Sequence, residues 1–157
     1  MADVFRCQLD WSGAAKGATR DAAAFSRDLD VMLGAIALPM SAAPSFRGDA
    51  TRANPEQLFV AALSACQALT YLFLAAKHGV VVTAYRDEAE GRLGVVEGRM
   101  RVSRVVLRPH VTLADRSNEP KARELVEKAH HDCFIANSTT TPVQLEPVFE
   151  FGETRAT

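Results

Sequence analysis

The stretch that most constrains the fold covers residues 54–79 and reads NPEQLFVAALSACQALTYLFLAAKHG. No charged side chain occurs between Glu56 and Lys77. Asn54 is typical of the residue that begins a helix, and Gly79 of the residue that follows one. The sequence therefore predicts a single helix of about six turns that is apolar on every face.

A helix that is apolar all round either spans a membrane or is covered by protein on every side. The polar side chains of Ser64, Gln67 and Thr70, and the amphipathic patterns in the rest of the chain, argue against a membrane span. A chain of 157 residues can hardly bury such a helix completely. We therefore expect a second subunit to cover its exposed side, which makes the protein a homodimer.

Composition narrows the class of protein further. The net charge is −1 and the Lys and Arg residues are scattered, so we expect neither a nucleic-acid partner nor a membrane partner held by charge. The first residues contain no apolar segment typical of a secretory signal, which favours a cytoplasmic location. Three cysteines are too few for a disulfide framework.

The hydrophobic pattern before the long helix predicts β-structure. Residues 4–11 alternate like a strand, residues 12–21 read as a turn, and residues 25–33 read as a second strand that pairs back on the first. Residues 39–53, rich in Ala, Pro and Ser, are typical of a loop.

The pattern after the long helix adds more strands and one helix. Residues 80–93 and 99–113 read as two long strands, residues 118–133 as an amphipathic helix, and residues 141–151 as a closing strand. No repeat or linker interrupts this order. The sequence therefore predicts one α+β domain over residues 1–157.

The three cysteines allow several interpretations. Cys66 lies in the middle of the long helix, where a buried core thiol is the commonest role, and a reactive thiolate there would need a cation from elsewhere, most plausibly an Arg. Cys133 ends the second helix, and the cluster HHDC at residues 130–133 raises a zinc site, although adjacent histidines point to different sides of a helix. Cys7, on one face of the first expected strand, looks structural.

The run NPEQLFVAALSAC resembles the signature of the OsmC/Ohr family, the osmotically inducible and organic-hydroperoxide-resistance proteins. The resemblance consists of Asn-Pro-Glu-Gln-Leu, a small apolar stretch and a Cys ten residues after the Glu. It extends over most of the chain, because the strands and the second helix ending in a Cys follow in the expected order. It implies an OsmC-like fold, with antiparallel sheets around two central helices, and an intertwined homodimer.

The resemblance also implies a thiol peroxidase without metal or prosthetic group. Cys66 matches the peroxidatic cysteine of the family, Cys133 the resolving cysteine and Glu56 the catalytic glutamate. The family uses an Arg from its N-terminal hairpin, for which Arg20 is the first candidate and Arg27 the second. The substrate would be an organic hydroperoxide, and an external dithiol would reduce the enzyme.

The chain departs from the family pattern at the second cysteine. It has CFIANS where the family often has Cys-Pro-x-Ser, a form associated with a divergent OsmC-like branch. Apolar side chains near the first cysteine, those of Phe59, Leu63 and Leu69, would favour an organic hydroperoxide over hydrogen peroxide. Two other functions stay open, namely a redox-sensing or apolar-ligand-binding dimer and a metal protein that uses Cys133.

The spacing of Glu56 and Cys66 sets a geometric condition. Ten residues on one straight helix correspond to a rise of about 15 Å, so one Arg cannot bind the Glu and also touch the Cys sulfur. Either the chain around residues 54–59 folds back over the thiol, or Glu56 and the Arg come from the other subunit. The need to cover the apolar helix favours the second arrangement, in which Cys66 and Cys133 belong to one chain and Glu56, with Arg20, to its partner.

Overall fold

The computed structural model describes residues 3–152, and the chain divides into two compact units, Met1–Leu58 and Phe59–Thr157. The prediction of a single domain therefore stays a prediction. The helices are α1 (Pro55–Lys77), α2 (Glu119–Asp132) and α3 (Phe134–Asn137), with short 3-10 helices η1 (Ser12–Lys16), η2 (Pro44–Phe46) and η3 (Arg116–Asn118). The strands are β1 (Gln8–Asp10), β2 (Leu29–Leu33), β3 (Ile36–Met40), β4 (Val82–Asp87), β5 (Glu90–Val96), β6 (Arg99–Leu107), β7 (Pro109–Leu113), β8 (Val143–Leu145) and β9 (Val148–Phe151).

The first unit contains an antiparallel sheet in the order β1-β2-β3. The predicted pairing of the first two strands is confirmed, with Leu9 opposite Val31. The predicted length of the first strand was wrong, because only three of its eight residues find partners on β2. The predicted turn at residues 12–21 begins with the 3-10 helix η1, and β3 reaches into the stretch expected to be loop.

Helix α1 begins and ends where the sequence predicted. The Asn54 side chain accepts a hydrogen bond from the Gln57 backbone N–H at 2.9 Å, and the Gln57 side chain accepts one from the Asn54 N–H at 3.0 Å, which is a reciprocal capping box. Gly79 has φ +73°, the left-handed conformation that ends helices, and the Val80 N–H then reaches back to the Ala75 carbonyl at 2.9 Å.

As the sequence predicts, the isolated chain does not cover α1 on every side, and the expected cover by a second subunit stays a prediction. One face is buried, and it carries Leu63, Gln67, Tyr71, Leu74 and Ala75. The opposite face is apolar but open, with Leu69 71% exposed and Phe73 65% exposed. The chain alone therefore covers only half of this helix.

Length and composition would allow α1 to cross a membrane, and within residues 3–152 it is the one such helix. Its most apolar window has a mean hydropathy of 1.9, and 28% of that window is buried within the chain. Core helices of water-soluble proteins have the same length and composition, so these properties do not distinguish a membrane-spanning helix from a core helix. The packing of its buried face against strands and α2 is that of a core helix.

The second unit carries two mixed sheets, in the orders β4-β7-β9 and β5-β6-β8. The two long strands expected after α1 are in fact four, because each breaks near its middle. At the break the Asp87 carboxylate accepts the Arg108 backbone N–H at 2.7 Å. The expected closing strand is likewise two strands, and each adds in parallel to a different sheet. The sheets are therefore not purely antiparallel.

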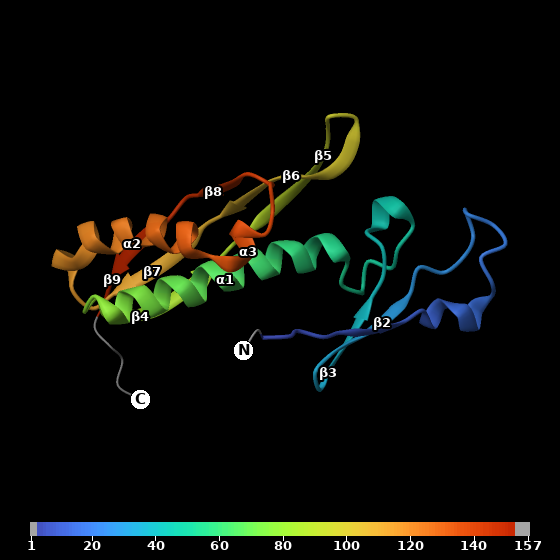
Figure 1. Ribbon diagram of the computed structural model, residues 1–157, viewed down its shortest axis with the longest axis horizontal. Helices are drawn as coiled ribbons and strands as arrows, with labels where there is room; N and C mark the ends of the chain where they lie inside the picture. The colour runs from blue at the N-terminus through green and yellow to red at the C-terminus, as the bar shows by residue number, and fades with distance from the viewer. Residues whose placement is uncertain (1–2, 153–157) are drawn as a thin grey trace. The chain divides into compact units, whose positions relative to one another are not determined.

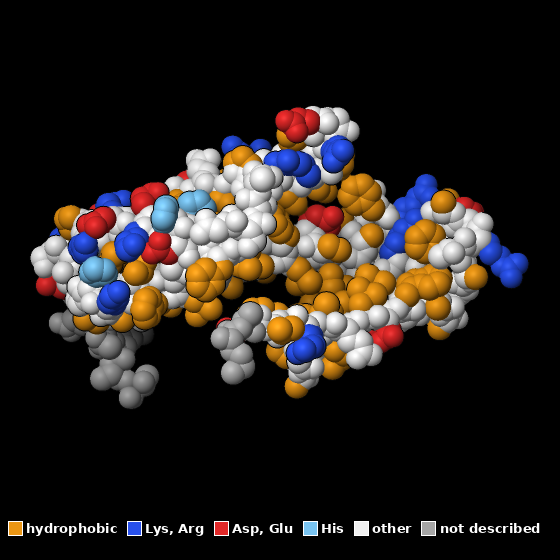
Figure 2. Space-filling view, in the orientation of Figure 1, with side chains coloured by type: hydrophobic (Ala, Val, Ile, Leu, Met, Phe, Trp, Pro, Cys, Tyr) orange, Lys and Arg blue, Asp and Glu red, His pale blue; other side chains and the backbone are white. Residues whose placement is uncertain are grey.

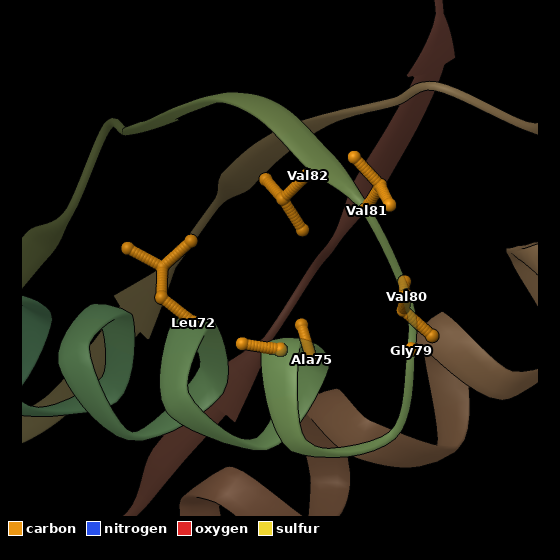
Figure 3. Close-up of a pocket in the computed structure, with 7 residues that line it drawn as sticks. Leu72, Ala75, Gly79, Val80, Val81 and Val82 are labelled. Carbon is orange, nitrogen blue, oxygen red and sulfur yellow. The ribbon is translucent and has the colours of Figure 1, made fainter.

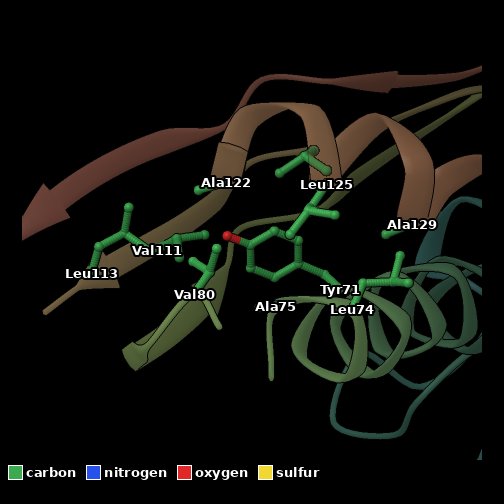
Figure 4. Packing of buried hydrophobic residues seen from close by; sticks show 10 residues of the cluster. Tyr71, Leu74, Ala75, Val80, Val111, Leu113, Ala122, Leu125 and Ala129 are labelled. Carbon is green, nitrogen blue, oxygen red and sulfur yellow. The ribbon is translucent and has the colours of Figure 1, made fainter. Parts of the chain in front are cut away.

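Both helices pack on these sheets in the second unit (Figure 1). Figure 4 shows the Tyr71 ring of α1 lying between Val111 of β7 and Leu125 of α2, and all three residues are fully buried. The Gln67 side chain ties α1 to α2 by donating to the Val126 carbonyl at 3.0 Å. A second cluster places Leu63 of α1 against β6. This packing fixes the middle of α1, where Cys66 lies, relative to the end of α2.

The outward side of α2 is polar. Ion pairs along it join Glu119 to Arg123, Lys121 to Glu124 and Lys128 to Asp132. Figure 2 shows these charged side chains and the histidines gathered over α2, whereas hydrophobic side chains gather over α1. Exposed ion pairs of this kind add little stability each, so the apolar packing beneath them holds the helix in place.

Candidate active site

Cys66 lies at the border between the buried and the open faces of α1. It is half-buried, as is Thr70 one turn later on the same side of the helix. Leu63 and Gln67, on either side of Cys66, are 1% exposed and anchor this part of the helix in the core. The thiol therefore sits on a rigid element but remains within reach of the open face.

Cys133 lies where α2 ends and α3 begins. Its backbone is extended, with φ −70° and ψ 118°, which breaks the helix and turns the chain. Its sulfur accepts a hydrogen bond from the Ala136 N–H at 3.4 Å, and its carbonyl accepts one from the Asn137 N–H at 3.0 Å. The side chain is 1% exposed, so this cysteine is held inside the second unit.

Both cysteines are free thiols, and each is among the groups that shift the pKa of the other. Burial alone raises the pKa of Cys66, but four hydrogen bonds outweigh it and leave this pKa below its ordinary value. The donors are the Cys133 thiol, the backbone N–H groups of Ile135 and Phe134, and the Thr70 side chain. Cys66 is therefore the sulfur that more readily carries the negative charge.

Cys133 behaves in the opposite way. Burial raises its pKa first, and the hydrogen bond with Cys66 raises it further, while the Ala136 N–H only partly offsets both effects. One sulfur is thus favoured as a thiolate and the other as the thiol that donates to it. Neutral donors within the second unit thus already lower the pKa of Cys66, and the expectation that a cation from elsewhere stabilises its thiolate stays a prediction.

A pocket of about 330 Å³ opens between α1 and the junction of α2 and α3, and its lining residues include neighbours of both cysteines in the sequence but neither cysteine itself. Thr70 and Phe134, which both donate to Cys66, belong to its wall. The other lining residues are Leu69, Phe73, Leu74 and Asp132. Leu69 therefore lies where the sequence suggested, but Leu63 and Phe59 do not line this pocket, because they pack into the core against β6.

A second pocket in the same unit has no groups suited to chemistry. Figure 3 shows it between the end of α1 and the start of β4, lined by Leu72, Ala75, Ala76, Gly79, Val80, Val81 and Val82. Its volume is about 280 Å³. Because every lining residue is apolar or glycine, nothing in its wall could act as an acid, a base or a nucleophile.

Glu56 does not meet Cys66 along α1. The helix is continuous from Pro55, so the alternative in which residues 54–59 fold back over the thiol is wrong. The rise between the two residues is about 15 Å. One carboxylate oxygen of Glu56, Oε2, is buried and has no hydrogen-bond partner within residues 3–152.

The two candidate arginines of the first unit differ in how they are held. Arg27 donates to the Phe25 and Ala22 carbonyls, and its guanidinium stacks over the Phe25 ring at 4.1 Å. Arg20 is exposed, and within residues 3–152 its guanidinium makes neither a hydrogen bond nor an ion pair. Arg27 is thus occupied by its own loop, which leaves Arg20 the more available of the two.

The remaining candidates are not drawn into the site. Cys7 is exposed and precedes β1, so the expectation that it packs on a strand face was wrong. Within residues 3–152, no three His, Cys, Asp or Glu side chains gather in a way that could hold a metal ion. In the HHDC cluster, His131 instead hydrogen-bonds Asp132 at 2.9 Å.

Three donors to Cys66 were missed from the sequence. Thr70 could have been found from its position one turn after Cys66. The N–H groups of Phe134 and Ile135 had a weaker signal, namely that neither residue after Cys133 is a proline, so each has an N–H group to donate.

Comparison with known proteins agrees with this fold. The model of the OsmC-like protein family matches residues 48–148, and the chain therefore belongs to this family. An OsmC-like protein of unknown function from Vibrio cholerae is 32% identical, with a TM-score of 0.85 over 94% of this chain and 100% of that one. A search of curated proteins gives no match.

More distant structures share the fold alone. One is described as an organic hydroperoxide resistance protein OsmC from Legionella pneumophila, with 18% identity and a TM-score of 0.66 over 96% of this chain and 98% of that one. Another is the organic hydroperoxide resistance protein OhrB of Bacillus subtilis, with 21% identity and a TM-score of 0.60 over 96% of this chain and 98% of that one. The same fold thus occurs in proteins named for organic hydroperoxide resistance.

Proposed function

We propose that this protein is a thiol-dependent peroxidase that reduces organic hydroperoxides to alcohols. The observation that carries the proposal is the pair of free thiols, Cys66 and Cys133, which influence each other's pKa so that the pKa of Cys66 is lowered and that of Cys133 is raised. Peroxide cleavage by a thiolate followed by disulfide formation needs this division of roles. The fold supports the proposal, since it occurs in proteins named for organic hydroperoxide resistance.

The chemistry balances without a metal or prosthetic group. The Cys66 thiolate attacks the terminal oxygen of the hydroperoxide, the O–O bond breaks, and the alkoxide takes a proton and leaves as the alcohol. Cys66 is then a sulfenic acid. The Cys133 sulfur attacks it, a disulfide forms, and the sulfenic oxygen leaves as water. An external dithiol restores both thiols by exchange and is itself oxidised to a disulfide.

The pocket beside the pair favours a substrate with an alkyl or aryl group. Its wall offers Leu69, Phe73 and Leu74 to an apolar tail and the Thr70 hydroxyl to a polar oxygen. Burial of apolar surface stabilises a bound tail by about 25 cal/mol for each Å² removed from water. Consumption of cumene hydroperoxide by the wild type beside Cys66→Ser, in the presence of a dithiol, tests the function.

The open apolar face of α1 supports a homodimer. Its residues recur at helical spacing on one side, and they are Ala61, Ala62, Ala65, Leu69, Leu72, Phe73 and Ala76. Contiguous apolar surface of this kind marks an interface in a soluble protein. We propose that a second copy of the chain covers this face, because the uncharged helix α1 would then be buried on both sides.

Ala65→Glu should convert the dimer into a monomer. Ala65 is exposed at the centre of this face, and Glu is nearly as good a helix former as Ala, so the folded chain should survive while the interface acquires a buried charge. Sedimentation should give twice the chain mass of 17.0 kDa for the wild type and the chain mass for the variant. Ala114→Glu, at an exposed strand end, is the matched control and should stay dimeric. A monomeric wild type would contradict the proposed dimer.

We also propose that the partner subunit completes each site with Glu56 and Arg20. The buried, unpaired Oε2 of Glu56 supports this, because a buried carboxylate oxygen without a donor is costly. The exposed guanidinium of Arg20 is a donor of the right charge. In this arrangement the Arg adds to the neutral donors already at Cys66 and can bind the departing alkoxide.

A further inference from the structure

The loop between η1 and β2, residues 17–27, is closed at its base by Asp28. The Asp28 carboxylate belongs to a residue that is 6% exposed, and Lys16, the last residue of η1, donates to it at 2.7 Å. A second contact joins the same two sides of the loop, because the Trp11 side chain donates to the Ser26 carbonyl at 2.8 Å. The η1–β2 loop is therefore a compact surface loop whose ends are held together.

Arg20 lies within this loop, next to a turn with hydrogen bonds of its own. The Asp21 side chain accepts the Ala23 N–H at 2.7 Å, and the Asp21 carbonyl accepts the Phe25 N–H at 3.1 Å. The Phe25 ring packs edge-on against Trp11, with ring centroids 6.3 Å apart. The backbone that carries Arg20 is therefore held both at the base of the loop and within it.

Asp28 also contacts the part of the chain that leads into α1. The Ser41 hydroxyl, in a residue that is 1% exposed, donates to Asp28 at 3.3 Å and accepts the Asp49 N–H at 3.1 Å. The Ser41 N–H donates to the Ala53 carbonyl at 2.8 Å, three residues before Glu56. Asp28 thus joins the η1–β2 loop to the segment from which α1 begins.

We propose that Asp28 is a positioning residue that holds Arg20 and Glu56 in one fixed arrangement, so that the first unit presents both groups together to Cys66 of the partner subunit. This inference rests on the proposed function and on the shared site. It adds a residue that touches neither the thiol nor the peroxide. Two groups that are already positioned lose less conformational entropy at the site than two groups that move independently.

The arrangement requires a charged Asp28, and the surroundings favour that form. The hydrogen bond from Lys16 has the largest effect and lowers the pKa of Asp28, while burial opposes it. The Arg52 Nε lies 4.0 Å from the same carboxylate and adds a second positive charge. A neutral side chain of the same shape would keep an oxygen for Ser41 but lose its hold on Lys16.

Asp28→Asn and Lys16→Met test the closed loop without a peroxide. Each removes the ion pair, and the Lys16 side chain is 68% exposed, so its replacement leaves the packing of the first unit intact. The readout is the rate of chymotrypsin cleavage after Phe25, identified by mass spectrometry. Because Phe25 packs against Trp11, cleavage there should follow the fraction of molecules in which the loop is open.

The cleavage rate should rise about tenfold in both variants, the scale of one hydrogen bond to a charged group. Lys16→Arg keeps the ion pair and should stay near the wild-type rate. Lys121→Met is the matched control, because it removes an exposed ion pair of α2, and it should also keep that rate. If neither test variant is cleaved faster than Lys121→Met, Asp28 does not hold the loop and the proposal is overturned.

Mixed dimers show on which site Asp28 acts. In a heterodimer of Asp28→Asn and Cys66→Ser chains, the one intact thiol receives Arg20 and Glu56 from the chain whose Asp28 is unchanged. Peroxidase activity should therefore rise from roughly a tenth of the wild type in the Asp28→Asn parent to about half in the heterodimer. Asp28→Asn mixed with Glu56→Gln should not recover, since every site then receives a defective first unit.

Equal activities of the two heterodimers, or the reverse order, would overturn the proposal, because a general loss of stability affects both mixtures alike. Lys16→Met replaces Asp28→Asn in both mixtures if the latter does not fold. Faster cleavage after Phe25 in a protein without peroxide turnover would refute the proposed function and confirm that Asp28 holds the loop. Turnover with unchanged cleavage would overturn this inference and leave the proposed function standing.

Discussion

Cys66→Ser is expected to lower the rate of cumene hydroperoxide reduction on the order of 10³-fold or more, the scale on which enzymes lose activity with their nucleophile. The serine hydroxyl has nearly the same size, but it does not ionise near neutral pH and does not cleave the O–O bond. The fold should survive, because Leu63 and Gln67 still anchor this part of α1 in the core.

The measurement is peroxide consumption with a dithiol present, alongside thermal unfolding of each protein. Cys7→Ser is the matched control, since Cys7 is exposed and makes no contribution to the pair. It should retain wild-type turnover. If Cys66→Ser turns over like the wild type, the assignment of the nucleophile fails, whatever the fold.

Mixing Cys66→Ser chains with Glu56→Gln chains should restore activity that neither parent has. If sites are shared between subunits, a heterodimer holds one site with both defects and one with neither, so it should show roughly half the activity of a wild-type dimer. The geometric basis is the continuous helix from Pro55, which separates Glu56 from Cys66 by about 15 Å within one chain.

Subunit exchange must be verified, for example by native mass spectrometry of chains with different tags. A mixture of Cys66→Ser with Cys133→Ser is the matched control. Both of these residues belong to the same chain's site, so no heterodimer contains an intact site and activity should not return. Heterodimers of the first mixture that stay as inactive as the parents would show that each site is built within one chain.

Local signals in the sequence were sufficient to predict where α1 begins and ends. The capping box of Asn54 and Gln57 and the left-handed Gly79 act within a few residues, so the helix bounds could be predicted closely. The amphipathic pattern of α2 was also visible in the sequence, and Leu125 and Ala129 on its inner face are fully buried. The family resemblance named Cys66 and Cys133, and the structure brings these two together.

Longer-range effects were not visible in the sequence. The long apolar strands break where the Asp87 carboxylate takes the Arg108 N–H, a contact between residues 21 positions apart. The alternation of apolar residues continues across the second break, from Val105 to Leu113, so periodicity alone could not find that one. Backbone donors have no sequence letter of their own, and the N–H groups that acidify Cys66 were therefore missed. A partner for Glu56 could not be predicted from the sequence either, and within residues 3–152 its buried Oε2 has none.

The most direct test of the account is to identify what one equivalent of cumene hydroperoxide does to the wild-type thiols. Peptide mapping without reductant should find the Cys66 and Cys133 peptides joined, with the loss of two hydrogens and one molecule of alcohol formed per chain. In Cys133→Ser the serine hydroxyl still donates to Cys66 but cannot resolve it, so the Cys66 peptide should carry one added oxygen. Both cysteines still reduced beside unconsumed hydroperoxide would contradict the account and leave a dimer that only binds apolar ligands.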